Sequence, residues 1–270
     1  MIIAIDIGGT KIRIGYSHLG THLEDSLQFP TPVSQRVVVK SLIDNIHRLV
    51  GTSPIDAIGI ASPGSINKDR GTIVAPRNLP WHNLRITKPL KDFFNCPVLL
   101  EHDATAGGIA EARIGAGRGH SVVLYVTIST GIGNSIIING SPIPTKYSQE
   151  GGWQIISQGD GEDRFGQLSS GRAIQLRFGK IAAEIHDSNT WQIIASDLAV
   201  GLYNMITIVQ PDCVVLAGGV AVHYKHFIKP LKKQLESFNP IYPIPPIKQA
   251  RYVETAPALG VMLLAVEELS

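Results

Sequence analysis

Cysteine is scarce in this sequence of 270 residues, which contains only Cys96 and Cys213. Two cysteines are too few for a disulfide scaffold or for a structural zinc site with three or four thiolate ligands. Nine histidines are present, but no two of them stand in an H-x-H or H-E-x-x-H pattern. The sequence therefore gives no support to a metal-dependent hydrolase.

Long hydrophobic runs are also missing. No stretch of about 18 uncharged apolar residues occurs, which predicts that the chain has no transmembrane helix. Residues 1–6 lack the basic segment of a signal peptide, and Asp6 and Lys11 interrupt the apolar sequence around them. We therefore expect a cytoplasmic protein without a membrane partner.

An excess of either charge is lacking too, since 24 basic residues stand against 22 acidic ones. A net charge of +2 creates no strong field toward nucleic acid. Apolar residues make up 44% of the chain and charged residues 17%, so the chain can bury a large core. At about 150 residues per domain, its length predicts one large domain or two modest ones.

The 27 glycines and 17 prolines fall between apolar runs, which predicts short elements joined by tight turns. Apolar patterns predict strands at 2–7, 11–16, 55–61, 97–100, 121–128, 135–138 and 213–216. Helices are expected at 34–50, 104–114, 191–209, 223–237 and 256–269.

The order of these elements repeats. Residues 6–15 and 127–140 each read as a strand, a glycine and threonine turn, and a second strand, and strands and helices then alternate. Such alternation favours mostly parallel sheets with helices on both faces. We expect an N-terminal α/β domain at 1–103, joined by the helix at 256–270, and a C-terminal α/β domain at 104–255. Residues 141–172 are polar and glycine-rich, and we interpret them as an insertion at the cleft between the domains.

The turn after the first strand combines groups that suit a phosphate. Gly8 and Gly9 let the backbone approach an anion, while Thr10 adds a hydroxyl and Lys11 a charge. Asp6 can hold Mg²⁺ through water, because this ion prefers oxygen ligands and keeps much of its hydration. An ordinary hairpin turn explains the same residues, and it is the better interpretation for an isolated pair of glycines.

Two further turns of this kind follow apolar strands. Residues 127–133 carry the hydroxyls of Ser129 and Thr130, and residues 216–220 contain two adjacent glycines. Each turn alone is weak evidence, but three of them at strand ends favour a nucleotide cleft.

Asp103 stands where a predicted strand ends and a predicted helix begins. Aspartate is a good helix N-cap. A carboxylate at the carboxyl end of a strand also lies where open α/β sheets bind ligands, and there it can accept the proton of a substrate hydroxyl. The two roles are compatible.

Seven motifs, read in order along the chain, resemble the ROK family of sugar kinases and repressors. They are DIGGTK (6–11), IASPG (60–64), RNLPW (77–81), EHDATAGGIAEARIGAG (101–117), TISTGIG (127–133), LAGGV (216–220) and PALGVMLLA (257–265). The resemblance covers essentially the whole chain. It implies the actin-like ATPase (ribonuclease H-like) fold, with two α/β domains around a nucleotide and sugar cleft. It also implies transfer of the γ-phosphoryl group of ATP, or of polyphosphate in some members, to a sugar hydroxyl with Mg²⁺, and a homodimer.

The resemblance assigns roles by position. Asp103 matches the general base. Sugar contacts match Gly64, Asn78 and Glu150, together with His102 and Trp153 at positions where this chain differs. Phosphate and adenosine contacts match Gly8, Gly9, Thr10, Lys11, Thr130, Gly131, Gly133, Gly218 and Gly219.

This chain departs from the family pattern at several of these positions. His102 replaces an asparagine, and its ring can bond a sugar hydroxyl or hold a proton near Asp103. Ser129 and Asn134 replace glycines and add side chains where phosphate should approach. Trp153 replaces a histidine that contacts sugar and zinc, and it can pack in the fold or stack on a sugar. The zinc-binding cysteine motif is missing from residues 155–170, so no zinc is expected.

We therefore expect a glucokinase-like hexose kinase that uses ATP and Mg²⁺, with the 6-hydroxyl as the favoured acceptor. A polyphosphate-dependent glucokinase and a weakly active or inactive sugar sensor are the alternatives. The family's repressors carry an N-terminal helix-turn-helix, whereas this chain starts at its first strand, so no nucleic-acid partner is expected. The proline-rich residues 240–246 are expected to form a rigid surface connection.

Overall fold

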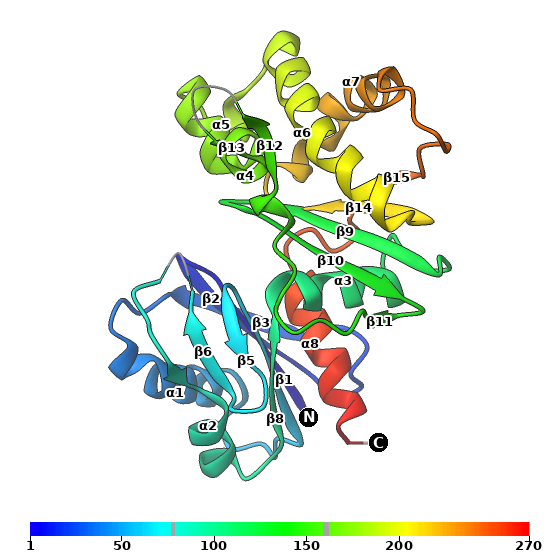
Figure 1. The fold of residues 1–270 in the computed structure, drawn as a ribbon. Helices are drawn as coiled ribbons and strands as arrows, with labels where there is room; N and C mark the ends of the chain where they lie inside the picture. The colour runs from blue at the N-terminus through cyan, green and yellow to red at the C-terminus, as the bar shows by residue number, and fades with distance from the viewer. Residues whose placement is uncertain (77–78, 159–161, 270) are drawn as a thin grey trace. The chain divides into compact units, whose positions relative to one another are not determined.

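The chain divides into two compact units in the computed structural model, which describes residues 1–76, 79–158 and 162–269 (Figure 1). Unit 1 contains residues 1–110, 145–148 and 255–270, and unit 2 contains residues 111–144 and 149–254. Unit 1 thus continues past residue 103, the expected end of the N-terminal domain, along the helix that begins there.

The sheet of unit 1 has five strands in the order β3-β2-β1-β4-β8. The first three are antiparallel neighbours, and β4 and β8 are parallel to β1. Their bounds are β1 (Ile2–Ile7), β2 (Lys11–Ser17), β3 (Asp25–Pro30), β4 (Ala57–Ser62) and β8 (Val98–His102).

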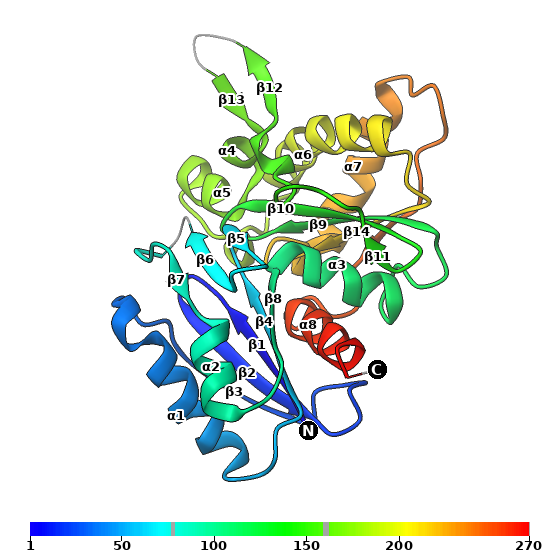
Figure 2. The same ribbon diagram turned by 60° about the horizontal axis from the view of Figure 1, so that its bottom comes forward.

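Helices cover both faces of this sheet (Figure 2). α1 (Val38–Val50) and α2 (Thr87–Phe94) lie on one face, and α8 (Ala256–Glu267) lies on the other against β1 and β4. A small antiparallel sheet of β5 (Ser65–Asn67), β6 (Thr72–Ala75) and β7 (Leu84–Arg85) completes the unit.

Two glycines allow α8 to approach its neighbours closely. A Cβ at Gly59 in β4 would overlap the carbonyl of Val261, and a Cβ at Gly260 would overlap the carbonyl of Ala106. Ala106 lies in α3 (Asp103–Arg113), which follows β8 directly. The close packing of α8 therefore fixes the start of α3, where Asp103 stands.

The sheet of unit 2 repeats that of unit 1, with the order β11-β10-β9-β14-β15. Again two antiparallel pairs are followed by two parallel ones, which confirms the predicted repeat. The strands are β9 (Val122–Ile128), β10 (Ile132–Ile138), β11 (Ser141–Pro142), β14 (Cys213–Ala217) and β15 (Ile247–Gln249).

Unit 2 is covered by α6 (Ser188–Val209), α7 (Tyr224–Ser237), and the shorter helices α4 (Phe165–Ser169) and α5 (Gly171–Phe178). Within the described ranges, α6 is the one helix long and apolar enough to cross a membrane. Trp191, Leu198 and Leu202 of this helix are buried in the core of unit 2, together with residues of β9 and β14. Its apolar character is that of a core helix.

The region expected as an insertion, residues 141–172, contains short elements of its own. It begins with β11 and includes the 3₁₀ turn η2 (Gly151–Trp153), the hairpin of β12 (Ile155–Gln158) and β13 (Glu162–Arg164), and α4. The remaining 3₁₀ turns of the chain are η1 (Gln35–Val37), η3 (Ala182–Glu184) and η4 (Ala221–His223).

Every strand and helix expected from the sequence is present, with shifted ends. The helix expected from residue 34 begins as η1 and becomes α1 at Val38, and the strand expected from residue 135 begins at Ile132. Cys213 is the first residue of β14, and both cysteines are buried. β3, α2, α5, β15 and the small sheet of β5–β7 were not predicted from the sequence.

Candidate functional site

Two aspartates lie at the carboxyl edge of the sheet in unit 1. Asp6 is near the end of β1 and Asp103 follows β8, and these strands are both parallel to β4. Burial, and to a smaller extent the nearby charge of Asp103, raise the pKa of Asp6 from 3.8 to about 7, against the opposing charges of Arg13 and Lys11. The edge therefore brings together two carboxylates that repel each other.

Asp103 stands at the junction of β8 and α3, as expected, but its carboxylate bonds the amide of the next residue and not those of the N-cap pattern. It is the first residue of α3, and its Oδ1 accepts a hydrogen bond of 2.6 Å from the amide of Ala104. Its negative charge at this helix end is favourable. The side chain is 33% exposed, so the carboxylate also remains open to a ligand.

His102 is buried beside this carboxylate. Its Nε2 lies 3.4 Å from Oδ1 of Asp103, while its Nδ1 is buried and has no hydrogen-bond partner within the described part of the chain. A buried polar atom left unpaired costs about 1–3 kcal/mol. A hydrogen bond from a bound ligand would remove that cost.

An ion pair with a buried carboxylate and an exposed lysine lies next to this histidine. Oε2 of Glu101 is 2.5 Å from Nζ of Lys68, and its Oε1 accepts a hydrogen bond of 2.8 Å from the amide of His102. Through these two contacts Glu101 connects the end of β8 to Lys68, which lies outside this strand. No signal in the sequence indicates this pair, because Lys68 is 33 residues from Glu101 along the chain and belongs to no motif.

The turn at residues 8–11 is narrow and exposed. The amide of Gly8 donates to the carbonyl of Lys11 at 3.0 Å, and a Cβ at Gly8 would lie 2.7 Å from that oxygen. Gly9, Thr10 and Lys11 are exposed, so the turn presents a backbone, a hydroxyl and an ammonium group. The carbonyl of Gly8 accepts a hydrogen bond from Oγ1 of Thr31, which fixes the turn on its other side.

Gly64 follows β4 with a φ of +78°. A Cβ there would lie 2.6 Å from Cα of Pro76, so only glycine fits between the two segments. Asn78, the sugar contact expected just beyond Pro76, lies outside the described residues, as does Arg77.

The second and third glycine turns meet at one edge of the sheet in unit 2. Residues 129–131 join β9 to β10, and Gly218 and Gly219 follow β14, which is parallel to β9. Gly218 has a φ of +85° and lies against the backbone of Ile128, whose carbonyl accepts the amide of Val220 at 3.0 Å. Ser129, Thr130, Gly131 and Gly219 are exposed, and Gly133 lies in β10.

Asn134 does not extend into the exposed turn, contrary to the expectation that it would obstruct phosphate. It is buried in β10, and its Oδ1 accepts a hydrogen bond of 2.6 Å from the amide of Gly151. The side chain points to the segment that carries Glu150. Of the two unusual side chains in this turn, Ser129 alone is exposed.

Glu150 directly precedes η2 and Trp153 is its last residue; both are exposed, the tryptophan by 40%. The guanidinium of Arg164 lies 4.7 Å from the centroid of the Trp153 ring, and its Nη1 donates to the Trp153 carbonyl at 3.4 Å. Trp153 is therefore held by a cation–π contact and still presents surface to a ligand.

Within the described residues, no three or more histidine, cysteine, aspartate or glutamate side chains gather in a group that could hold a metal ion. Asp6 fits the looser requirement of Mg²⁺, which can be held by one or two carboxylates, by waters and by substrate phosphates. The repulsion between Asp6 and Asp103 is a second reason for a cation at this edge.

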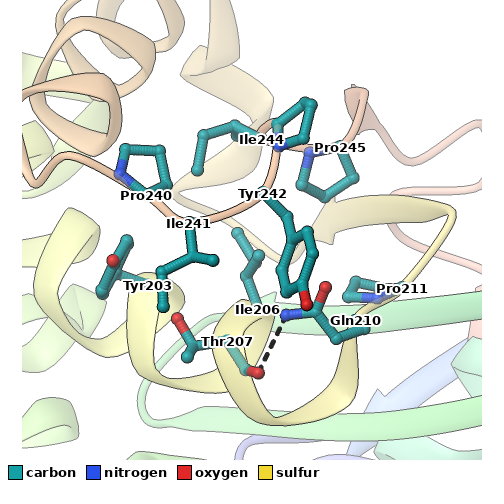
Figure 3. Close-up of a pocket in the computed structure, with 11 residues that line it drawn as sticks. Tyr203, Ile206, Thr207, Gln210, Pro211, Pro240, Ile241, Tyr242, Ile244 and Pro245 are labelled. Atoms are coloured by element: carbon teal, nitrogen blue, oxygen red, sulfur yellow. Dashed lines mark hydrogen bonds between the residues drawn. The ribbon is translucent and has the colours of Figure 1, made fainter.

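A separate pocket lies in unit 2 between the end of α6 and residues 240–246 (Figure 3). Its volume is about 280 Å³, and none of the expected phosphate or sugar residues lines it. Prolines form much of its wall, and Ile241 and Tyr242 are largely exposed. Residues 240–246 thus run over the surface, as expected.

Comparison with known proteins agrees with the motifs. The model of the ROK family matches residues 2–152 and 166–268. The chain belongs to the ROK family. The glucokinase of Streptomyces coelicolor (strain ATCC BAA-471 / A3(2) / M145) is 30% identical over 138 residues, which are 51% of this chain and 44% of that protein. The xylose repressor of Bacillus subtilis (strain 168) is 24% identical over 98% of this chain and 73% of that protein.

Solved structures of ROK proteins have the same fold. A ROK family glucokinase from Streptomyces griseus in complex with glucose and AMPPNP has a TM-score of 0.85 and 22% identity, covering 98% of this chain and 99% of that one. An inorganic polyphosphate/ATP-glucomannokinase from Arthrobacter sp. strain KM has a TM-score of 0.77 and 26% identity, covering 99% and 98%. This ROK protein therefore has the actin-like ATPase fold, as expected.

Proposed function

We propose that this ROK protein is a hexose kinase that transfers the γ-phosphoryl group of ATP to a sugar hydroxyl, with the 6-hydroxyl of glucose as the leading acceptor. The observation that carries this proposal is the carboxylate of Asp103. It is one-third exposed at the start of α3, beside Asp6 at the carboxyl edge of the sheet. Edges of this kind bind ligands in α/β proteins.

Asp103 acts as the general base. Its carboxylate accepts the proton of the sugar hydroxyl as that oxygen forms a bond to the γ-phosphorus. The bond from phosphorus to the bridging oxygen breaks, and ADP leaves. Positioned general bases of this kind contribute about 10²–10⁴-fold to rates.

The donor is held by the three glycine turns. Gly8–Lys11 and residues 130–133 approach the phosphates, and Gly218 and Gly219 leave room for the adenosine. Asp6 would hold Mg²⁺ through water, and that ion supplies charge neutralisation at the phosphate oxygens. The exposed positions of Thr10, Lys11 and Thr130 support this assignment.

The sugar is bound by polar groups from several segments. Glu150 and the amide of Asn78 can pair with vicinal hydroxyls, and Gly64 lets the backbone come close. Buried His102 has an unpaired ring nitrogen for one more hydroxyl. Trp153 can stack on the ring of the sugar. A site of this kind discriminates strongly against analogues that lack a hydroxyl, because its own polar groups are then left unpaired.

Two alternatives share the same residues. The Arthrobacter relative named for polyphosphate and ATP supports polyphosphate as a second donor to test. The xylose repressor relative supports a test for sugar binding without phosphorylation. We further propose that the protein is cytoplasmic and forms a homodimer. Light scattering of the purified protein measures its oligomeric state.

The decisive experiment measures ADP release with ATP and Mg²⁺ over a panel of hexoses and N-acetylhexosamines, and then sugar phosphate formation with polyphosphate. We expect phosphorylation of at least one hexose, with a loss of about 10²–10⁴-fold in Asp103→Asn. Asp69→Asn, a change at an exposed aspartate in a turn of unit 1, is the matched control. Micromolar sugar binding without phosphorylation by either donor would overturn the kinase proposal in favour of a sensor. Full activity of Asp103→Asn would overturn the assignment of the base.

A further inference from the structure

The side chain of Asn134 links β10 to the segment that carries Glu150. Its Oδ1 accepts the amide of Gly151 at 2.6 Å, and its Nδ2 donates to Oε1 of Gln149 at 3.4 Å. The same Oε1 of Gln149 accepts the amide of Ile136 at 2.8 Å. The residues on both sides of Glu150 are thus tied to one strand.

Packing makes this link specific. A Cβ at Gly151 would lie 2.6 Å from Oδ1 of Asn134, and a Cβ at Gly152 would overlap the carbonyl of Ile132. The two glycines are therefore required by the backbone and the side chain that β10 presents to them. Asn134 itself is only 5% exposed, so the hydrogen bonds of its side-chain amide are formed away from solvent.

The other end of the segment has a second anchor. Oε1 of Gln154 accepts a hydrogen bond of 3.1 Å from Asn204 in α6, and its carbonyl accepts the amide of Phe165 at 3.0 Å. Arg164 covers the ring of Trp153. Residues 149–154, which we term the Glu150 segment, are thereby held at both ends, while the Glu150 side chain between them is exposed.

We propose that Asn134 is a positioning residue for sugar binding. Through Gly151 and Gln149 it fixes the backbone on both sides of Glu150, so that this carboxylate is presented in one orientation. The inference rests on the proposed sugar site, since Glu150 is its expected acceptor of sugar hydroxyls. A displacement of about 1 Å in a positioning group can cost on the order of 10²-fold in activity.

Substitutions on both sides of the contact test the proposal. Asn134→Ala removes the acceptor for Gly151, and Gly151→Ala pushes against the same oxygen from the opposite side. Asn134→Asp keeps the acceptor for Gly151 but loses the Nδ2 donor to Gln149. Asn45→Ala is the control. The side-chain amide of Asn45 donates one hydrogen bond to the carbonyl of Ser41 within α1 of unit 1.

Two readouts are measured on the full chain. Hydrogen exchange, followed by mass spectrometry, reports the protection of the Glu150 segment. Steady-state kinetics report KM for the hexose, KM for the phosphoryl donor and kcat. We expect Asn134→Ala and Gly151→Ala to speed exchange in residues 149–154 and to raise the hexose KM by about tenfold, while the donor KM changes less than twofold. Asn134→Asp should raise the hexose KM less than Asn134→Ala does, because it keeps the acceptor for Gly151.

The outcomes separate this inference from the proposed function. If the wild-type chain binds glucose in a calorimeter but phosphorylates nothing, the kinase proposal fails, and the same variants are scored by their glucose Kd. Unchanged exchange in Asn134→Ala would overturn the positioning role. Faster hydrogen exchange in Asn134→Ala with an unchanged hexose KM or Kd would also overturn the positioning role. If the wild type binds no hexose at all, the kinase proposal and the positioning role both fall.

Discussion

Asp6 and Asp103 bring two carboxyl groups to the carboxyl edge of one sheet, and the charge of Asp103 helps to raise the pKa of Asp6 to about 7. Asp6 is half-buried next to the glycine turn at residues 8–11. The folded chain therefore keeps an unfavourable arrangement at this edge in the absence of ligand. Such arrangements are typical of sites whose partner is a cation or a substrate.

Asp6→Asn should make the ligand-free protein more stable at alkaline pH. Folding raises the pKa of Asp6 from 3.8 to about 7, so the folded state binds more protons than the unfolded state between these values. The contribution of Asp6 to the free energy of unfolding thus falls as pH rises through this window, and its destabilising effect is complete above about pH 7. We expect Asp6→Asn to gain on the order of 2 kcal/mol at about pH 8 and nothing at about pH 4.

Urea unfolding without Mg²⁺ at the two pH values measures this difference. Asp69→Asn, at an exposed turn position in the same unit, controls for the general effect of removing a negative charge. A gain of equal size at both pH values would contradict the role of Asp6 protonation.

Lys68→Met should destabilise the protein because it leaves the Glu101 carboxylate buried without its cation. Glu101 is 7% exposed at its side chain and Lys68 is 55% exposed, so water weakens the pair only from the lysine side. We expect a loss of about 1–2 kcal/mol, below the cost of breaking a fully buried pair. The measurement is the free energy of unfolding in urea.

A double-mutant cycle completes the test. Glu101→Gln removes the charge but keeps an oxygen that can accept the amide of His102. The double variant should lose less than the sum of the two single variants, with a coupling energy of about 1 kcal/mol. Additive losses would show that Lys68 and Glu101 act independently.

Local signals in the sequence were sufficient to predict most of the longer strands and helices, although β3 and α2 were missed. The run at residues 2–7, with its glycine turn, predicts β1 and the start of β2, and the strand ending before Asp103 predicts the position of this carboxylate. The repeat of the hairpin pattern predicts two similar α/β halves, and the two large sheets of the structure have the same strand order. The short strands β5–β7 were missed, because they are too short for an apolar alternation to develop.

Side-chain directions and distant contacts could not be predicted in the same way. Asn134 follows a glycine turn, and from the sequence its side chain is expected at that turn, but the pleat of β10 buries it toward Gly151. The partner of Glu101 lies 33 residues earlier in the chain. No local pattern specifies such contacts, since they depend on how separate segments pack.

Gly59→Ala should destabilise unit 1. A methyl group at this position in β4 would overlap the carbonyl and the side chain of Val261 in α8. The helix must then move away from the sheet, at a cost of about 1–3 kcal/mol typical of overpacking. Thermal unfolding measures the loss. A melting temperature equal to that of the wild type would show that α8 can shift without cost.

Gly131→Ala should separate nucleotide binding from folding. Among the described residues, nothing lies within 4 Å of a Cβ built at Gly131, and its φ is not in the left-handed region, so the methyl group fits the folded chain. If residues 130–133 approach the phosphates, that methyl group stands where the backbone must come close to the donor. We expect an unchanged melting temperature and a rise of at least about tenfold in the KM for ATP.

Gly219→Ala provides the matched comparison on the adenosine side. It is also open in the folded chain, and it follows β14 beside the same edge of the sheet. It should raise the KM for ATP but leave the KM for polyphosphate unchanged, because polyphosphate has no adenosine to accommodate. If the protein uses both donors, Gly131→Ala should raise the KM for ATP and the KM for polyphosphate. If Gly131→Ala changes neither constant, the turn at residues 129–131 is an ordinary hairpin connection, and the phosphates must be bound elsewhere.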